Sequence, residues 1–336
     1  MSERRFSVKK ALGKTGMQVS RIGLGAWAIG GKAYGELGSQ QAEKTVEAYF
    51  ECGGNFVDTA RMYDDSEAVI GSVMKRMGNR EQVILCTKSM SGGTKEEMPG
   101  FRQDIETSLK VLGTDYIDLY YLHNPPVEHD EIMRMLDILA EYKQQGKIRA
   151  IGASIKGVNV TDQTIELCHT YLDTGMVDAL MLCYSIFRQR TAEVFKACAD
   201  KGVGVVVRSV LESGFLTGAY EKGHVFSETD HRNRWAREAL DEMFTEAKAL
   251  QREAIKPPYD NLAQVAIQFA LEEPGVSCGI VGAASPEDVY RNTTLDSLPP
   301  LPSDTVAMLK QRFAGKTERY NAGVWNYGEY KQTGVK

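Results

Sequence analysis

The sequence predicts an α/β fold in which eight parallel strands, each followed by a helix, close into a barrel. Two observations favour this fold. Short β-branched, apolar runs alternate with segments of helical spacing along most of the 336 residues. Some runs, such as residues 203–207, are continuously apolar, which is typical of strands covered on both faces. The expected strands are residues 22–27, 55–59, 83–88, 116–123, 148–154, 179–185, 202–209 and 277–283.

The chain before the first strand predicts a smaller element. Gly13-Lys-Thr-Gly16 is a turn signal between two extended pieces. We interpret these pieces as an N-terminal β-hairpin that closes the bottom of the barrel. Helical segments follow the strands, and Ser39 and Asp162 stand where helix-capping residues are expected.

Two segments exceed the usual length of a loop. Residues 212–260 follow the seventh expected strand and include a charged stretch with helical spacing. The tail, residues 314–336, carries several aromatic side chains. We expect this tail either to pack on the barrel or to cover a substrate pocket as a lid, and the sequence does not separate the two. No linker or repeat interrupts the pattern, so residues 1–336 are interpreted as a single domain.

Composition excludes several functional classes. A hydrophobic fraction of 43%, a charged fraction of 25% and a net charge of −5 are ordinary for a globular protein and give no basic footprint for nucleic acid or an anionic membrane. No membrane span or signal peptide is recognisable, so we expect a cytoplasmic protein. The six cysteines form no Cys-x-x-Cys pair, which indicates buried, reduced thiols. His129, His169, His224 and His231 show no metal-ligand spacing, so we expect surface histidines and no metal site.

Four polar residues of different types lie at or just beyond the ends of three successive expected strands. Asp58, Lys88 and His123 end these strands, and Tyr63 follows Asp58 by five residues. Each residue alone is typical of a cap, a solvated strand end or a packing side chain. Barrel enzymes, however, take their catalytic groups from the carboxyl ends of several strands. We therefore expect the four side chains to form one site.

The chemistry of these groups suits protonation of a carbonyl oxygen. A tyrosine has a pKa near ~10, and a neighbouring lysine cation lowers that value. We therefore expect Tyr63 to have a lowered pKa beside Lys88, with Asp58 keeping the lysine charged and His123 orienting the substrate oxygen. Because side chains carry no hydride, a nicotinamide cofactor is implied.

Longer motifs surround these residues. They are Asn55-Phe-Val-Asp-Thr-Ala-Arg-Met-Tyr63, Ser66-Glu-Ala-Val-Ile-Gly71, Ser108-Leu-Lys-Val-Leu-Gly-Thr-Asp-Tyr-Ile-Asp-Leu-Tyr-Tyr-Leu-His123, Gly146-Lys-Ile-Arg-Ala-Ile-Gly152, Leu211-Glu-Ser-Gly-Phe-Leu-Thr-Gly218 and Gly282-Ala-Ala-Ser-Pro-Glu-Asp-Val-Tyr-Arg-Asn292. In this order they resemble the aldo-keto reductase family. The resemblance implies a (β/α)8 TIM barrel that binds NADP(H), with NAD(H) possible, and that interconverts an aldehyde or ketone and an alcohol. It also implies a catalytic tetrad of Asp58, Tyr63, Lys88 and His123, with Tyr63 as general acid and base.

The same resemblance implies a set of cofactor-binding residues, grouped by the strands that they follow. They are Trp27 near the carbonyl, Asp58 and Ser154 near the nicotinamide, Arg208, Ser209, Leu211, Ser213 and Gly214 around the phosphates, and Gly282, Asp288 and Asn292 around the adenosine.

The sequence also departs from the family pattern. Ile155 and Met181 replace an asparagine and a glutamine that typically hold the nicotinamide carboxamide. Ala219 and Ala284 occupy places where basic residues often pair with the 2′-phosphate of NADP. Our hypothesis is that the protein accepts NADH.

Two other functions stay open at this stage. The barrel could hold nicotinamide as a redox-sensing regulatory subunit with little turnover, like the potassium-channel β subunits. It could also be a lyase or isomerase that uses Lys88 as a Schiff-base nucleophile. In each enzymatic case the partner is a small-molecule carbonyl or alcohol, and the sequence indicates no oligomeric state.

Overall fold

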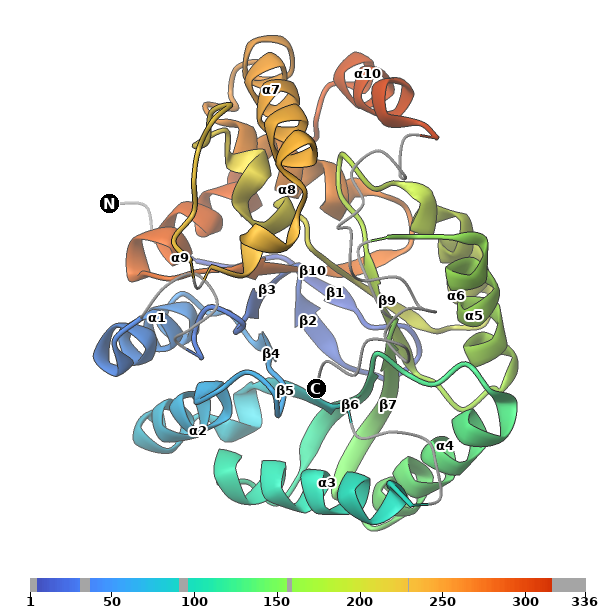
Figure 1. The fold of residues 1–336 in the computed structure, drawn as a ribbon. Helices are drawn as coiled ribbons and strands as arrows, with labels where there is room; N and C mark the ends of the chain where they lie inside the picture. Colours follow the sequence, from blue (N-terminus) through green and yellow to red (C-terminus); the bar gives the residue numbers. More distant parts are fainter. Residues whose placement is uncertain (1–4, 31–36, 91–95, 156–158, 229, 316–336) are drawn as a thin grey trace.

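The structure is a computed structural model and describes residues 5–30, 37–90, 96–155, 159–228 and 230–315. Eight of its strands form a closed barrel in which every neighbouring pair is parallel (Figure 1). In order around the barrel, the strands are β3 (Ile22–Gly25), β4 (Phe56–Asp58), β5 (Ile84–Ser89), β6 (Ile117–His123), β7 (Ile148–Ser154), β8 (Ala179–Cys183), β9 (Gly204–Arg208) and β10 (Val276–Gly282), and β10 pairs back with β3. The predicted fold is confirmed.

Helices surround the barrel as an outer layer (Figure 1). They are α1 (Ser39–Glu51), α2 (Ser66–Met77), α3 (Met98–Leu112), α4 (His129–Gln144), α5 (Asp162–Asp173), α6 (Phe195–Asp200), α7 (Arg237–Glu253), α8 (Leu262–Glu272), α9 (Pro286–Thr293) and α10 (Ser303–Phe313). Short 3-10 turns join them: η1 (Arg80–Gln82), η2 (Arg190–Val194), η3 (Glu212–Thr217), η4 (His231–Arg234) and η5 (Thr294–Ser297). The long insert after β9 therefore contains η3, η4 and α7. Most of the tail, residues 316–336, lies outside the described residues, so its role as packing segment or lid remains a prediction.

The N-terminal hairpin closes the barrel, as predicted. β1 (Lys9–Ala11) pairs antiparallel with β2 (Gln18–Ser20), and both lie across the centre of the barrel in Figure 1. Leu12 and Val19 are fully buried and pack with interior barrel side chains. At the turn, a Cβ atom on Gly13 would meet the carbonyl oxygen of Gly202 at 2.4 Å, so only glycine permits this approach.

Two predicted helix caps are each wrong by one residue. Helix α1 has Gly38 at its N-cap, and Ser39 is the first helical residue. Helix α5 is capped by Thr161, whose side chain forms a capping box with Thr164, so Asp162 is likewise inside the helix. The polar residue before Asp162 is a better cap because its hydroxyl group reaches the amide of Thr164.

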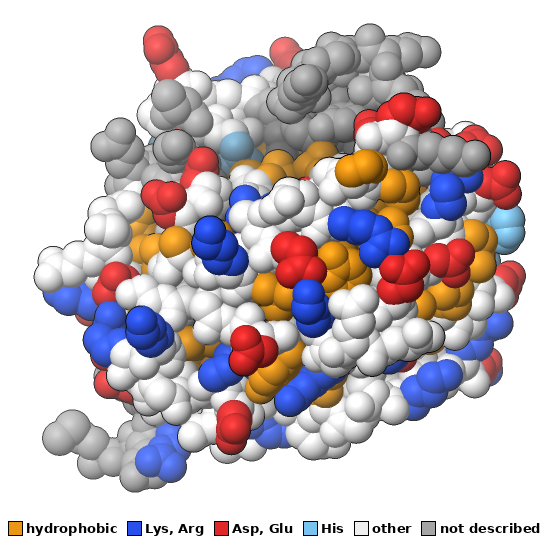
Figure 2. Space-filling model, turned by 90° about the horizontal axis from the view of Figure 1, so that it is seen from below, with side chains coloured by type: hydrophobic (Ala, Val, Ile, Leu, Met, Phe, Trp, Pro, Cys, Tyr) orange, Lys and Arg blue, Asp and Glu red, His pale blue; other side chains and the backbone are white. Residues whose placement is uncertain are grey.

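The distribution of surface charges and the state of the cysteines agree with what the composition predicts. On the side of the molecule in Figure 2, acidic and basic side chains are interspersed. All six cysteines are free and buried, as expected. Among the described helices, none is long and apolar enough to cross a membrane. In the same part of the chain, no three His, Cys, Asp or Glu side chains are grouped so that they could hold a metal ion.

Candidate active site

The four predicted catalytic residues meet at one end of the barrel. Asp58 ends β4, Lys88 is next to last in β5, and His123 ends β6. Because neighbouring strands are parallel, their carboxyl ends open on the same side. Tyr63 lies in the loop between β4 and α2, above these strand ends.

A buried ion pair forms the base of this site. Lys88 Nζ donates to both carboxylate oxygens of Asp58 at 2.7 Å and to the carbonyl oxygen of Thr59 at 2.8 Å. Lys88 is 1% exposed and Asp58 is 4% exposed. Burial opposes the charge of Lys88, but Asp58 and Tyr63 together outweigh this effect, so the pKa of the lysine is raised. Lys88 is therefore a fixed cation.

The ring of Tyr63 lies between this cation and two other rings. Lys88 Nζ is 4.8 Å from the centre of the Tyr63 ring. The ring of His123 is 6.0 Å from that of Tyr63, and the ring of Trp27 is 4.7 Å from it on an edge-on approach. The structure thus brings all four predicted catalytic residues together, with Trp27 as a wall beside them.

The Ser66-Glu67 pair of the sequence motif anchors the loop that carries Tyr63. The Ser66 hydroxyl group lies 2.7 Å from that of Thr59. Glu67 accepts hydrogen bonds from Thr87 at 2.7 Å and from Arg61 at 2.5 Å. Because Thr87 precedes Lys88 on β5, these contacts tie the loop to the strand beneath it. This part of the motif has a structural role.

The predicted lowering of the pKa of Tyr63 is wrong. Burial raises the pKa of this hydroxyl group, and the Lys88 cation offsets only part of the effect, with Asp58 acting in the opposite sense to Lys88. Tyr63 is therefore protonated at neutral pH. Burial also lowers the pKa of His123 well below its usual range, and the cations of Lys88 and Arg208 add to this shift. His123 is therefore a neutral imidazole.

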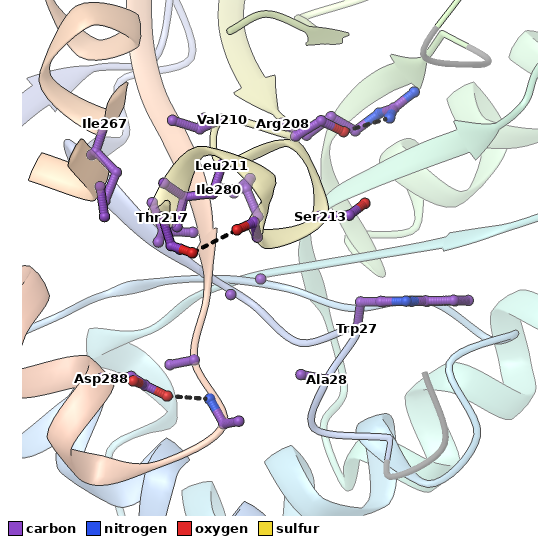
Figure 3. A pocket seen from close by; sticks show the side chains of 18 of the residues that line it. Trp27, Ala28, Arg208, Val210, Leu211, Ser213, Thr217, Ile267, Ile280 and Asp288 are labelled. Carbon is purple, nitrogen blue, oxygen red and sulfur yellow. Dashed lines mark hydrogen bonds between the residues drawn. The ribbon is translucent and has the colours of Figure 1, made fainter. Parts of the chain in front are cut away.

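The site opens into a cavity of about 920 Å³, at the upper end of the range for cofactor sites. Figure 3 shows Trp27 and Asp288 on opposite sides of this space, with Leu211 and Ser213 of the loop after β9 facing it. Every predicted cofactor-binding residue lines the cavity: Trp27, Asp58, Ser154, Arg208, Ser209, Leu211, Ser213, Gly214, Gly282, Asp288 and Asn292.

The loop after β9 has an unusual backbone. Ser209, Glu212 and Ser213 have φ values of 58°, 49° and 55°, and Gly214 has a φ of 91°. The amides of Glu212 and Gly214 are bonded within the loop to the carbonyl oxygens of Ser209 and Leu211, and a turn conformation of this kind can aim other backbone amides at an anion. Phosphate binding at this part of the cavity therefore stays a prediction, and the residues expected for it line the space.

The opposite end of the cavity is formed by the start of α9. Backbone amides at this helix start are already engaged by side chains. The Asp288 carboxylate accepts from the amide of Ala284 at 3.0 Å, and Ser285 accepts from the amide of Asp288 at 3.2 Å. Asp288 also accepts from Arg291 at 2.6 Å, and Arg291 lines the cavity. The cation that the sequence lacks at Ala284 is thus present nearby, but it is paired with a carboxylate.

The two substituted carboxamide positions differ in their surroundings. The Ile155 side chain is 1% exposed in the hydrophobic core, and its carbonyl oxygen accepts from Arg208 at 2.9 Å. Met181 packs inside the barrel, where its sulfur atom lies 3.5 Å from the hydroxyl group of Ser154. Neither side chain lines the cavity. Where the carboxamide is expected to bind, the polar side chains that line the cavity are therefore those of Ser154 and Arg208.

Sequence reasoning missed the contribution of the insert after β9. His231 was expected on the surface, but it lines the cavity with its ring 6.1 Å from that of Trp27. Its neighbour Arg232 binds both carboxylate oxygens of Asp230, at 2.9 Å and 2.5 Å, and also lines the cavity. Asp230 accepts a hydrogen bond from the amide of Arg232, and an aspartate in the sequence is a local signal for such a turn. This signal does not reveal which way the insert folds. His129, His169 and His224 are exposed, as expected.

A first prediction concerns the buried ion pair. Lys88→Met should lower the free energy of unfolding by about 3–5 kcal/mol, because it leaves Asp58 buried without its cation. Burial raises the pKa of Asp58, and without Lys88 only the more weakly acting Arg208 opposes this effect. In the folded variant, Asp58 should bind a proton at a pH at which the unfolded chain does not, since an unfolded aspartate binds one only near pH ~4. Proton binding then stabilises the folded variant, so its loss of unfolding free energy should shrink as the pH falls from 8 toward 5.

Urea unfolding of both proteins at several pH values measures this deficit. Arg102→Met is the control, because it breaks the exposed pair with Glu141 and should cost no more than about 1 kcal/mol. A deficit for Lys88→Met that is small, or that grows on acidification, would contradict the expected charge state.

Comparisons with known proteins agree with the geometry. The family model described as "Aldo/keto reductase family" matches residues 21–312. The chain is 32% identical to the NADH-specific methylglyoxal reductase of Escherichia coli (strain K12), over 93% of this chain and 99% of that protein. It is 30% identical to the aldo-keto reductase YhdN of Bacillus subtilis (strain 168), over 82% of this chain and 85% of that protein. The holo form of aldo-keto reductase AKR11C1 from Bacillus halodurans superposes with a TM-score of 0.71 at 26% identity, covering 90% of this chain and 95% of that one. The chain belongs to the aldo/keto reductase family.

Proposed function

We propose that this protein is an NAD(P)(H)-dependent oxidoreductase that interconverts an aldehyde or ketone and an alcohol, with Tyr63 as general acid and base. One observation carries the proposal. The fixed Lys88 cation lies against Tyr63 at the same cavity whose far wall is the left-handed loop after β9. A proton donor and an anion-binding loop in one cavity suit a dinucleotide and a carbonyl substrate.

The cavity residues fit such a cofactor by their chemistry. The backbone of Ser209, Leu211 and Ser213 would hold the two phosphates, Ser154 and Arg208 would flank the nicotinamide, and Asp288 and Asn292 would face the adenosine. When bound, the nicotinamide supplies the hydride that no side chain can provide.

In the proposed reaction, Tyr63 donates the proton to the carbonyl oxygen. Its raised pKa keeps the hydroxyl group protonated at neutral pH, so it can donate to a carbonyl oxygen. After donation the phenolate would lie beside the Lys88 cation, which stabilises it, and Asp58 balances the charge of that cation. His123 is neutral and can therefore orient the same oxygen without bringing another charge into the site. This arrangement favours reduction over oxidation near neutral pH.

The cofactor end of the cavity favours acceptance of NADH. Arg291, which lines this end of the cavity, is paired with the Asp288 carboxylate, and a carboxylate suits a ribose hydroxyl group better than a 2′-phosphate. The E. coli relative is named as NADH-specific, which supports the same inference.

A second prediction tests the proton donor. Tyr63→Phe should reduce turnover of a probe aldehyde such as methylglyoxal by ~10²–10⁴-fold, because it removes the general acid. The dissociation constant of the cofactor should stay nearly unchanged. Tyr142→Phe, on α4 outside the cavity, is the matched control and should retain wild-type turnover. Near wild-type turnover in Tyr63→Phe would remove this residue from the mechanism. A wild-type protein that binds cofactor tightly but turns over very slowly would instead favour the regulatory-subunit alternative.

A third prediction concerns cofactor choice. Quenching of tryptophan fluorescence should give saturable binding of both NADH and NADPH. A preference for NADPH of about a hundredfold or more, worth about 2.8 kcal/mol, would refute acceptance of NADH. Ala284→Arg should tighten NADPH binding by about tenfold, because it supplies the missing cation, and should leave NADH binding nearly unchanged.

A further inference from the structure

A fully buried ion pair lies next to the loop that lines the phosphate end of the cavity. Arg188 Nε donates to one carboxylate oxygen of Glu212 at 2.9 Å, and the two side chains are 0% and 1% exposed. The hydroxyl group of Ser185 donates to the other carboxylate oxygen. Ser185 and Arg188 form a tight turn after β8, whereas Glu212 begins η3 after β9. The contacts therefore join the loops that follow two neighbouring strands.

Glu212 begins the run of three consecutive left-handed residues. Its φ is 49°, and the following Ser213 and Gly214 have φ values of 55° and 91°. Leu211 and Ser213 line the cavity, but Glu212 does not, because its side chain is buried on the protein side of the loop. A non-glycine residue persists in the left-handed region only where its surroundings fix it. The ion pair supplies that constraint from behind the loop.

We propose that Arg188, Glu212 and Ser185 are positioning residues, which hold this loop in its cofactor-binding conformation before the diphosphate arrives. The inference rests on the proposed function, because it assumes that the cavity takes a nicotinamide dinucleotide. A loop that is already ordered loses less conformational entropy on binding, so the affinity rises. A buried ion pair seldom adds stability over apolar side chains of similar size, and in this loop we assign its directional contacts the role of specifying one conformation.

The test separates positioning from stability. The double variant Arg188→Met with Glu212→Met removes both charges and leaves no unpaired group of the pair. Isothermal titration should show a dissociation constant for NADH at least about tenfold higher than that of the wild type, equivalent to about 1.4 kcal/mol. Hydrogen exchange should accelerate in residues 209–218. At saturating NADH, kcat should stay within about threefold, because the proton donor and its partners are untouched.

A control removes another ion pair, in which the aspartate is buried and the arginine half-buried. Arg80 and Asp118 are paired at 2.8 Å near the amino end of β6, away from the cavity. Arg80→Met with Asp118→Met should lower the melting temperature but leave the dissociation constant of NADH within about twofold. An equal loss of affinity in this control would mean that general destabilisation weakens binding, and it would overturn the inference.

Other outcomes are equally decisive. Unchanged NADH affinity in the Arg188 and Glu212 double variant overturns the positioning role. If that variant does not fold, Ser185→Ala removes one contact and should raise the dissociation constant by about threefold, whereas an unchanged value overturns the role. A wild-type protein that binds neither NADH nor NADPH would overturn the proposed function instead.

Discussion

The buried ion pair between Lys88 and Asp58 is the constraint on which the rest of the site depends. A cation that is 1% exposed is stable only with a close counter-charge, and Asp58 supplies it through both carboxylate oxygens. The two residues come from neighbouring strands of a closed barrel, so the rigid sheet sets their separation. Tyr63 lies against this cation, and the loop that carries it is tied to β5 through Glu67 and Thr87. The geometry of the site therefore follows from the barrel and from one charge pair.

Burial has opposite consequences for the two remaining groups. It raises the pKa of Tyr63, so the hydroxyl group keeps its proton, and it lowers the pKa of His123, so the imidazole stays neutral. The positive charges that act on Tyr63 are then Lys88, paired with Asp58, and Arg208. In the proposed reaction, Lys88 would lower the free-energy cost of the phenolate left after proton transfer, while burial keeps the hydroxyl group protonated before it.

Much of this arrangement could be predicted from the sequence. Strand positions follow from apolar periodicity, and the polar residues at strand ends must share one face because all barrel strands are parallel. The direction of the pKa shift of Tyr63 could not be predicted, because it depends on how burial compares with the pull of Lys88. Sequence reasoning recognises the neighbouring charge but not the degree of burial. The insert after β9 was also beyond prediction, since the folding of a long loop depends on tertiary contacts such as that of His231 with Trp27. The pairing of Asp288 with Arg291 at the cavity could not be predicted, because it depends on where α9 begins after β10.

The pH dependence of carbonyl reduction tests the central claim most directly. The measurement is kcat for a probe aldehyde at saturating cofactor from pH 5.5 to 10.5. A histidine with a lowered pKa stays neutral as the pH falls through its usual value, and a tyrosine with a raised pKa stays protonated as the pH rises. The account predicts a constant rate across the neutral range, with no break near ~6.5 and a decline only above ~10. A rate that falls as the pH rises through 7 would show that Tyr63 ionises near neutrality, and it would contradict the proposed state of the site.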